Sequence, residues 1–240
     1  VPQLMSAEMV AERWGISRRE CEELSLQSHK RAAAAIEQGH FKREISPIEV
    51  PVDGGGKRVF DTDEGVRPDA NLEKMATLAG VVKPDGVVTA ATSSQISDGS
   101  AAILLASREW AEHRGLKPRA RVVATALAGV DPVLMLSGPI PASKKVLAKA
   151  KLRLKEIDLI EINEAFASVP LAWAKDLETD FRNVNVSGGA IALGHPLGCS
   201  GVRLLTTLLH EMERRDVRYG LSTMCIGFGQ ATATIIDRRL

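Results

Sequence analysis

Segments with strand and helix patterns alternate along the carboxy-terminal half of the sequence, and this alternation restricts the fold more than any other feature. Short runs rich in Val, Ile and Leu, typical of buried strands, are separated by longer segments with helical spacing of apolar residues. The strands are expected at Arg121–Ala128, Leu159–Ile162, Tyr219–Met224 and Ala231–Ile236, and the helices at Ala142–Ala150, Glu164–Asp176 and Cys199–Arg214. The pattern predicts a layered α/β domain whose last two strands form a hairpin.

The amino-terminal part of the chain is expected to be mainly helical. The segment Ser17–Glu20 is a capping box that opens an Ala-rich helix ending near Gly39. Two further apolar runs, Gly86–Ala91 and Ser100–Ala106, are expected to form strands, and Ser107 is expected to cap a short helix.

Composition excludes several classes of protein. The 240 residues include 31 Lys and Arg against 30 Asp and Glu, with no basic segment suited to nucleic acid or an anionic membrane. The 3 cysteines form no C-x-x-C pair, which argues against a disulfide framework and a zinc site and favours a reducing, cytoplasmic location. No apolar run approaches the roughly 18 to 20 residues that span a bilayer, and no secretory signal is recognisable. We therefore expect no nucleic-acid partner, no membrane span and no metal.

Three short segments contain residue types suited to acid–base chemistry. Asn163 follows the strand Leu159–Ile162, at the end of a sheet where side chains face a ligand crevice. His195 lies in the glycine-rich run 188–201, before a helix whose N-terminal dipole favours neutral imidazole. Cys225 ends another strand, and the glycines after it leave backbone N–H groups free to face an oxyanion. Each residue also has a purely structural interpretation: a helix cap, a packed loop histidine and an inert buried thiol.

Together the three segments favour carbonyl chemistry by a Cys–His pair with an Asn. A dinucleotide-binding loop is the weaker alternative, because the GxGxxG spacing is absent. The glycines at 54–56 lack the spacing of a Walker loop, and the G-x-S-x-G elbow of hydrolases is also absent.

The same segments resemble the thiolase family, whose members cleave or form 3-ketoacyl-CoA by exchange with acetyl-CoA. They read NEAFA from Asn163, GGAIALGHPLGCSG from Gly188 and CIGFG from Cys225, in the order of the family's three carboxy-terminal signatures. Weaker similarity extends over essentially the whole chain. It does not include the family's amino-terminal half, which carries the cysteine that becomes acylated, and no position here matches that cysteine.

The resemblance implies catalytic roles for four residues. It implies that His195 deprotonates the nucleophile and that Cys225 exchanges a proton with the α-carbon of acetyl-CoA. Asn163 holds a water that forms one oxyanion hole with His195, and the backbone N–H of Gly227 contributes to another. These roles suit the chemistry, because breaking a C–C bond next to a ketone produces an enolate that needs preorganised donors and a proton source.

The resemblance also implies binding residues. Arg67 matches the position that reaches the nucleotide end of CoA, and Ser94 matches a serine that touches the pantetheine arm. Met135 and Phe166 match apolar residues of the acyl pocket. Phe228 stands where the family usually has glycine, so we expect its ring to restrict or reshape that pocket. Without the resemblance these side chains are an ordinary surface Arg, a turn Ser and core residues.

The implied architecture is an α/β, thiolase-like layered fold. It consists of a complete C-terminal βαβαβαββ half, a helical loop domain and the end of the N-terminal half. We expect a CoA-covering loop domain at residues 1–95, the last elements of the N-terminal half at 96–118 and the C-terminal domain at 119–240. The implied substrates are CoA thioesters, with no covalently bound cofactor. The implied partners are the N-terminal half, in the same or a second chain, and identical subunits in a homodimer or homotetramer.

The implied activity is that of an acetyl-CoA C-acyltransferase: thiolytic cleavage of 3-ketoacyl-CoA, or the reverse Claisen condensation, in fatty-acid β-oxidation or steroid degradation. The alternative is a non-catalytic subunit that binds acyl-CoA or lipid and has lost the nucleophile. Retention of Asn163, His195 and Cys225 argues against a pure binder, which has no need of an acid–base cysteine. Cys21, among carboxylates, and Cys199, in the first turn of a helix, are poor replacements for the nucleophile.

Overall fold

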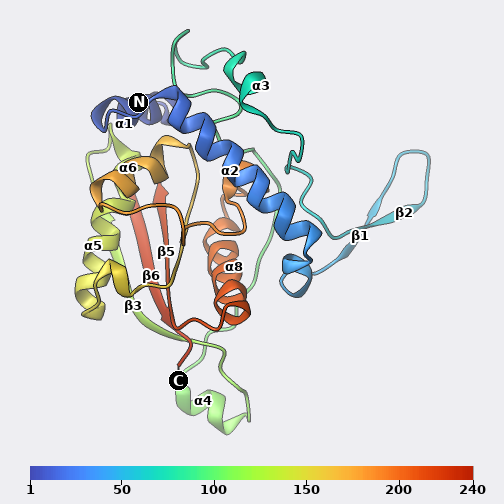
Figure 1. The fold of residues 1–240 in the computed structure, drawn as a ribbon. Helices are drawn as coiled ribbons and strands as arrows, with labels where there is room; N and C mark the ends of the chain where they lie inside the picture. Colours follow the sequence, from blue (N-terminus) through green and yellow to red (C-terminus); the bar gives the residue numbers. More distant parts are fainter. Residues whose placement is uncertain (240) are drawn as a thin grey trace.

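The computed structural model describes residues 1–239 and centres on a four-stranded mixed sheet (Figure 1). Its strands lie in the order β3 (Arg121–Gly129), β6 (Gln230–Asp237), β5 (Tyr219–Ile226) and β4 (Leu159–Ile162). β6 is antiparallel to both β3 and β5, whereas β4 is parallel to β5. A single parallel bridge joins Val184 to Ile160 at the edge of the sheet. The predicted α/β fold and the terminal hairpin are confirmed.

Helices cover both faces of this sheet (Figure 1). The helices are α5 (Pro139–Ala150) and α6 (Ser168–Asp176) on one face and α8 (Ser200–Arg214) on the other. Ile160 and Ile162 of β4 pack in the cluster that contains residues of α5 and α6, whereas Leu159 packs with Leu208 and Met212 of α8. Because side chains alternate along a strand, Glu161 shares the α8 face of the sheet with Leu159.

The amino-terminal helices lie over the end of the sheet at which β5 finishes. They are α1 (Gln3–Arg13) and α2 (Arg18–Glu37). Ala7 and Val10 of α1 pack in one apolar cluster with Cys225, close to the end of β5. At the start of α2, Ser17 and Glu20 form the expected capping box, each side chain accepting from the other residue's backbone N–H.

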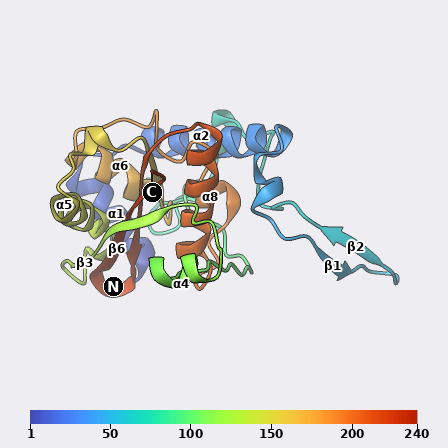
Figure 2. The same cartoon turned by 90° about the horizontal axis from the view of Figure 1, so that it is seen from below.

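The remaining elements are short. They are η1 (His40–Arg43), β1 (Ile48–Pro51), β2 (Lys57–Phe60), α3 (Leu72–Ala76), α4 (Arg108–His113), η2 (Met135–Ser137), η3 (Leu154–Glu156), α7 (Ala190–Leu193) and η4 (Gly227–Gly229). β1 and β2 form a separate antiparallel hairpin, which projects away from the body of the molecule (Figure 2). Ser107 caps α4, as expected from the sequence.

Two predicted strands are wrong. Residues 86–91 form no strand, because the backbone groups of Val88 bond to the Glu8 carboxylate and to Val81 instead of to a sheet. Residues 100–106 form no strand. They are exposed, with Leu104 and Leu105 at 73% and 72%, and no strand of the described residues lies beside them. An apolar run forms a strand only where another strand supplies hydrogen-bond partners.

Candidate active site

Asn163 directly follows β4, and its side chain is fully buried. Its backbone N–H donates to the Thr223 carbonyl at 3.1 Å, which extends the pairing of β4 with β5. The side chain caps no helix, because α6 begins at Ser168 with Ala167 as its N-cap residue. The capping interpretation and the predicted helix start at Glu164 are therefore wrong. Asn163 Nδ2 lies instead 3.3 Å from Nε2 of His195.

His195 lies on the loop between α7 and α8 and is held at its backbone and at both ring nitrogens. Its N–H donates to the Gln95 carbonyl at 3.1 Å, and Nδ1 lies 2.6 Å from Ser200 Oγ. Gly194 has φ of 88°, and a Cβ there would collide with the Ser97 side chain. Only glycine both adopts this positive φ without strain and leaves room for the Ser97 side chain. The chain therefore turns at this position and brings the imidazole to Asn163.

The surroundings of His195 favour its neutral form. The pKa of His195 lies below the ordinary value for histidine. Burial is the larger cause, and the positive charge of Arg203 is the second. The sequence predicts the same direction from the dipole of α8, whereas burial is the main cause in the structure. A neutral imidazole with a free nitrogen can accept a proton at neutral pH.

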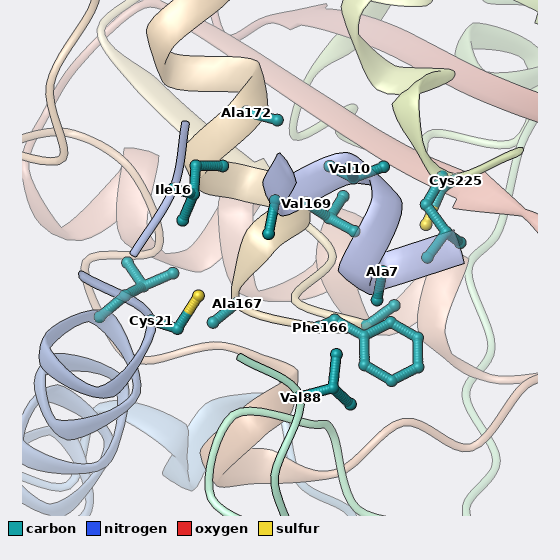
Figure 3. Packing of buried hydrophobic residues seen from close by; sticks show 14 of the residues in the cluster. Ala7, Val10, Ile16, Cys21, Val88, Phe166, Ala167, Val169, Ala172 and Cys225 are labelled. Atoms are coloured by element: carbon teal, nitrogen blue, oxygen red, sulfur yellow. The ribbon is translucent and has the colours of Figure 1, made fainter. Parts of the chain in front are cut away.

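Cys225 lies near the end of β5 in an apolar environment. Its side chain is 6% exposed and packs in a cluster with Ala7, Val10 and Phe166 (Figure 3). Burial raises the pKa of the thiol to about 12. The group therefore remains protonated at neutral pH, which suits a proton donor rather than a nucleophile. Among residues 1–239 no hydrogen bond joins this side chain to His195.

The loop after Cys225 contains one strained residue. Phe228 has φ of 66°, in the left-handed region, and its ring is 84% exposed. Gly229 follows with φ of 88°, and a Cβ on it would lie 2.6 Å from the Val130 carbonyl oxygen. Gly227 is half-buried beside Gln3. The ring of Phe228 thus projects outward in the described chain, and its effect on an acyl pocket stays a prediction.

The structure brings some predicted binding residues together and leaves one apart. Met135 and Phe166 are buried in the same cluster as Cys225. Ser94 lies next to them, because its N–H donates to the Ala165 carbonyl at 3.0 Å. Arg67 is exposed outside this cluster, and its backbone N–H donates to Nδ1 of the buried His29 at 3.2 Å.

A buried carboxylate network under the histidine loop was missed by the sequence analysis. Glu164 is 2% exposed and accepts hydrogen bonds from Ser28 Oγ at 2.7 Å, Asn185 Nδ2 at 2.8 Å and the Ile191 N–H at 3.2 Å. Ser28 Oγ in turn accepts from the Gly189 N–H at 2.9 Å. The network ties α2 to the segment before α7. A charged residue inside the apolar motif NEAFA was the available signal.

Three further residues that support the site were also missed. Ser200 contacts His195, and Gln95 Nε2 donates to the carbonyls of Gly65 and Ile191 at 2.8 and 3.0 Å. Arg203 on α8 is the third, because its charge acts on the imidazole. Ser200 and Arg203 lie close to His195 in the sequence and on one helix, which was a signal that they could contact the site. Gln95 is distant in the sequence and reaches the site only through tertiary folding.

Neither of the other cysteines is activated. Burial raises the pKa of Cys21 to about 12, and it also raises the pKa of Cys199. Within residues 1–239 no group of three His, Cys, Asp or Glu side chains is arranged to hold a metal ion. In the same residues no helix is long and apolar enough to cross a membrane.

Two family models match consecutive parts of the chain. The model for the thiolase N-terminal domain matches residues 3–109, so the similarity includes part of the N-terminal domain, contrary to the expectation that it leaves that half out. The model for the thiolase C-terminal domain matches residues 116–238. Curated relatives agree with this result. The steroid 3-ketoacyl-CoA thiolase FadA6 of Mycobacterium tuberculosis is 51% identical over 99% of this chain, which spans 57% of that relative. A 3-ketoacyl-CoA thiolase of Photorhabdus laumondii is 51% identical over 98% of the chain, which spans 61% of that relative.

Solved structures share the fold. The acetyl-CoA acetyltransferase of Bacillus anthracis superposes with a TM-score of 0.96 at 42% identity, covering 99% of this chain and 60% of that one. Human mitochondrial 3-ketoacyl-CoA thiolase in complex with CoA gives a TM-score of 0.95 at 43% identity, covering 99% and 59%. The chain thus spans about three fifths of the proteins it matches, and it belongs to the thiolase family.

Proposed function

We propose that this chain supplies the acid–base groups of a degradative 3-ketoacyl-CoA thiolase, which uses CoA to form acetyl-CoA and a shortened acyl-CoA. The observation that carries the proposal is the approach of Asn163 Nδ2 to His195 Nε2 at 3.3 Å. Strand β4 and the histidine loop meet there, and the buried Cys225 lies one residue before the end of the neighbouring strand β5. The names of the relatives, which include both a steroid and several general 3-ketoacyl-CoA thiolases, support the substrate class.

In the proposed reaction, a cysteine thiol attacks the 3-keto carbon of the substrate and gives its proton to Nε2 of His195. The bond between the α- and β-carbons breaks, and its electron pair forms the enolate of acetyl-CoA. Cys225 then protonates the α-carbon, a step that a thiol of raised pKa can perform because it has kept its proton. A second CoA thiol returns a proton to Cys225 and attacks the acyl thioester. Acyl-CoA leaves, and the first thiolate recovers its proton from His195.

Asn163 and Gly227 are assigned to charge stabilisation in this scheme. The Asn163 amide, directly or through a water, and the protonated His195 face one developing oxyanion, and the backbone N–H of Gly227 faces another. Donors fixed before the reaction lower the barrier more than donors that must reorient, and removing one such donor costs roughly 10²- to 10³-fold in rate. Met135, Phe166 and Phe228 are assigned to the acyl chain, Ser94 to the pantetheine arm and Arg67 to the nucleotide of CoA.

The attacking thiol is assigned to a part of the enzyme outside the described residues. All three cysteines of this chain are buried, and burial raises the pKa of each thiol. The N-terminal half of the thiolase fold, in the same or a second polypeptide, is the proposed source. We further propose a cytoplasmic homodimer or homotetramer. In the proposed division, residues 1–95 form the CoA-covering loop domain, 96–118 end the N-terminal half and 119–240 form the C-terminal domain.

The burial and raised pKa of all three cysteines also favour a second candidate. A thiolase-like subunit without a nucleophile would bind acyl-CoA or lipid and catalyse nothing. The two candidates differ in a single measurement: the binder saturates with acyl-CoA and shows no turnover, even with a nucleophile-bearing partner present.

The test measures thiolysis of acetoacetyl-CoA and of longer 3-ketoacyl-CoA substrates by the full product of the gene. His195→Ala is expected to lower kcat by roughly 10²- to 10⁴-fold, as loss of a general base does. His113→Ala is the matched control, because His113 is exposed on α4. Unchanged turnover by His195→Ala would show that the assignment of the base is wrong.

A further inference from the structure

Ser200 is the first residue of α8 and contacts the imidazole on the side away from Asn163. Its side chain is 1% exposed, and Oγ lies 2.6 Å from His195 Nδ1 and 3.0 Å from the Pro196 carbonyl oxygen. The backbone N–H of Ser200 also donates to that carbonyl, at 2.9 Å. The residue is therefore fixed to its own loop by two bonds and has one remaining partner, the imidazole.

The hydrogen-bonding capacity of each group limits the directions that these contacts can take. A serine hydroxyl has a single hydrogen, and a carbonyl oxygen only accepts. When the hydroxyl donates to Pro196, its oxygen is left to accept from His195, so Nδ1 carries the hydrogen. This assignment does not depend on the orientation of the Asn163 amide.

The contact on the opposite side of the imidazole ring is consistent with the same tautomer. Nδ2 of Asn163 is a donor only, so in this orientation of the amide the Nε2 atom that it faces at 3.3 Å is an acceptor without a proton. Two contacts on different elements, one after β4 and one on α8, are thus both satisfied by the same tautomer. The sequence motif shows that a serine lies near the histidine in the chain. It does not show the hydrogen bond that would fix the position of the imidazole proton.

We propose that Ser200 is a positioning residue that holds His195 as the Nδ1–H tautomer and keeps Nε2 free as the base. The proposal rests on the proposed function only in giving Nε2 its catalytic purpose. Ser200 touches no reacting atom, and it acts through the ring of His195. Without the hydroxyl, the proton can move to Nε2, where it would block the acceptance of a thiol proton.

The test is nitrogen NMR of the protein labelled with ¹⁵N-histidine, with the His195 resonances identified from a His195→Asn variant. The chain contains 5 histidines, so the spectrum is simple enough to assign. In the wild type we expect a protonated Nδ1 and an unprotonated Nε2. In Ser200→Ala we expect the tautomer ratio to shift toward Nε2–H by about tenfold, the change that loss of one hydrogen bond produces. Ser200→Thr keeps a hydroxyl and is expected to restore the wild-type pattern.

Thr206→Val is the matched control on the same helix, because Thr206 Oγ1 donates to the Val202 carbonyl at 2.9 Å and does not contact the ring. An Nε2–H tautomer in the wild type, or an unchanged ratio in Ser200→Ala, overturns the proposal. The wild-type spectrum alone decides which tautomer His195 adopts, even if a variant fails to fold.

Turnover separates this proposal from the proposed function. If His195→Ala keeps full activity while Ser200→Ala shifts the tautomer, the function is wrong and the role of Ser200 stands. If His195→Ala abolishes turnover and Ser200→Ala changes neither tautomer nor kcat, the function stands and the role of Ser200 is wrong.

Discussion

Arg203 of α8 lies 3.4 Å from the Glu161 carboxylate of β4, measured from Nη1 to Oε2. Glu161 is two residues before Asn163, and Arg203 is three residues after Ser200. The contact therefore joins the two elements that hold the imidazole of His195. Burial raises the pKa of Glu161 to about 8, against the lowering effect of Arg203. A carboxyl group that resists ionisation thus lies directly behind the candidate site.

Glu161→Gln is expected to remove a pH-dependent part of the stability. The carboxyl has a pKa of about 8 in the folded chain and an ordinary value of 4.5 when unfolded, so the folded state binds more protons between these values. Its stabilising effect is full below pH of about 4.5 and is lost as the pH rises through about 8. Between pH 5 and pH 8 the wild type should therefore lose about 3 kcal/mol relative to Glu161→Gln. Urea unfolding at both pH values measures this difference.

Glu156→Gln is the control for that experiment. Glu156 is exposed, and its interaction with Arg153 lowers its pKa, so the same replacement there should leave the wild-type slope between pH 5 and pH 8 unchanged. Equal slopes for wild type and Glu161→Gln would contradict the assignment.

Phe228→Gly should stabilise the chain. A non-glycine residue in the left-handed region costs roughly 1 to 2 kcal/mol, and Phe228 has φ of 66°. Glycine removes this strain but adds roughly 0.4 to 1 kcal/mol of unfolded-state entropy, which leaves a gain of about 1 kcal/mol. The exposed ring gives up little packing. Phe228→Ala separates the two effects because it removes the ring and keeps Cβ, so an equal gain in both variants would exclude backbone strain as the cause.

Gly189→Ala is expected to destabilise the fold by roughly 1 to 3 kcal/mol, the cost of overpacking a buried site. A Cβ at this position would collide with the Glu164 carboxylate and displace it from its three hydrogen-bond donors. Gly198→Ala lies on the same glycine-rich segment and has no neighbouring atom within 4 Å of the added Cβ. Thermal and urea unfolding should show a change within about 0.5 kcal/mol for this control. Similar losses in both variants would contradict the role of the Glu164 network.

The sequence predicted the layers of the fold well, because local patterns carry that information. The strands and helices of residues 121–237 are near their predicted positions, and the capping box at Ser17 starts α2 as expected. The errors concern pairing: residues 101–106 have the composition of a strand but no neighbouring strand among the described residues. The sequence pattern indicates the local conformation that a segment favours. Whether the segment forms a strand also depends on which other segments lie beside it in the folded chain.

For the candidate site, the sequence by itself determined which residues are candidates for the chemistry and which family the chain belongs to. The motifs that begin at Asn163, at Gly188 and at Cys225 are contiguous strings, and glycines fix the turns between them. Only the tertiary structure decided how these residues act together. The proposed proton position on His195 depends on Ser200 and Asn163, and the raised pKa of Cys225 depends on its burial in a cluster with residues of α1. Hydrogen-bond direction and desolvation arise from atoms distant in the chain, so they exist only once the chain has folded.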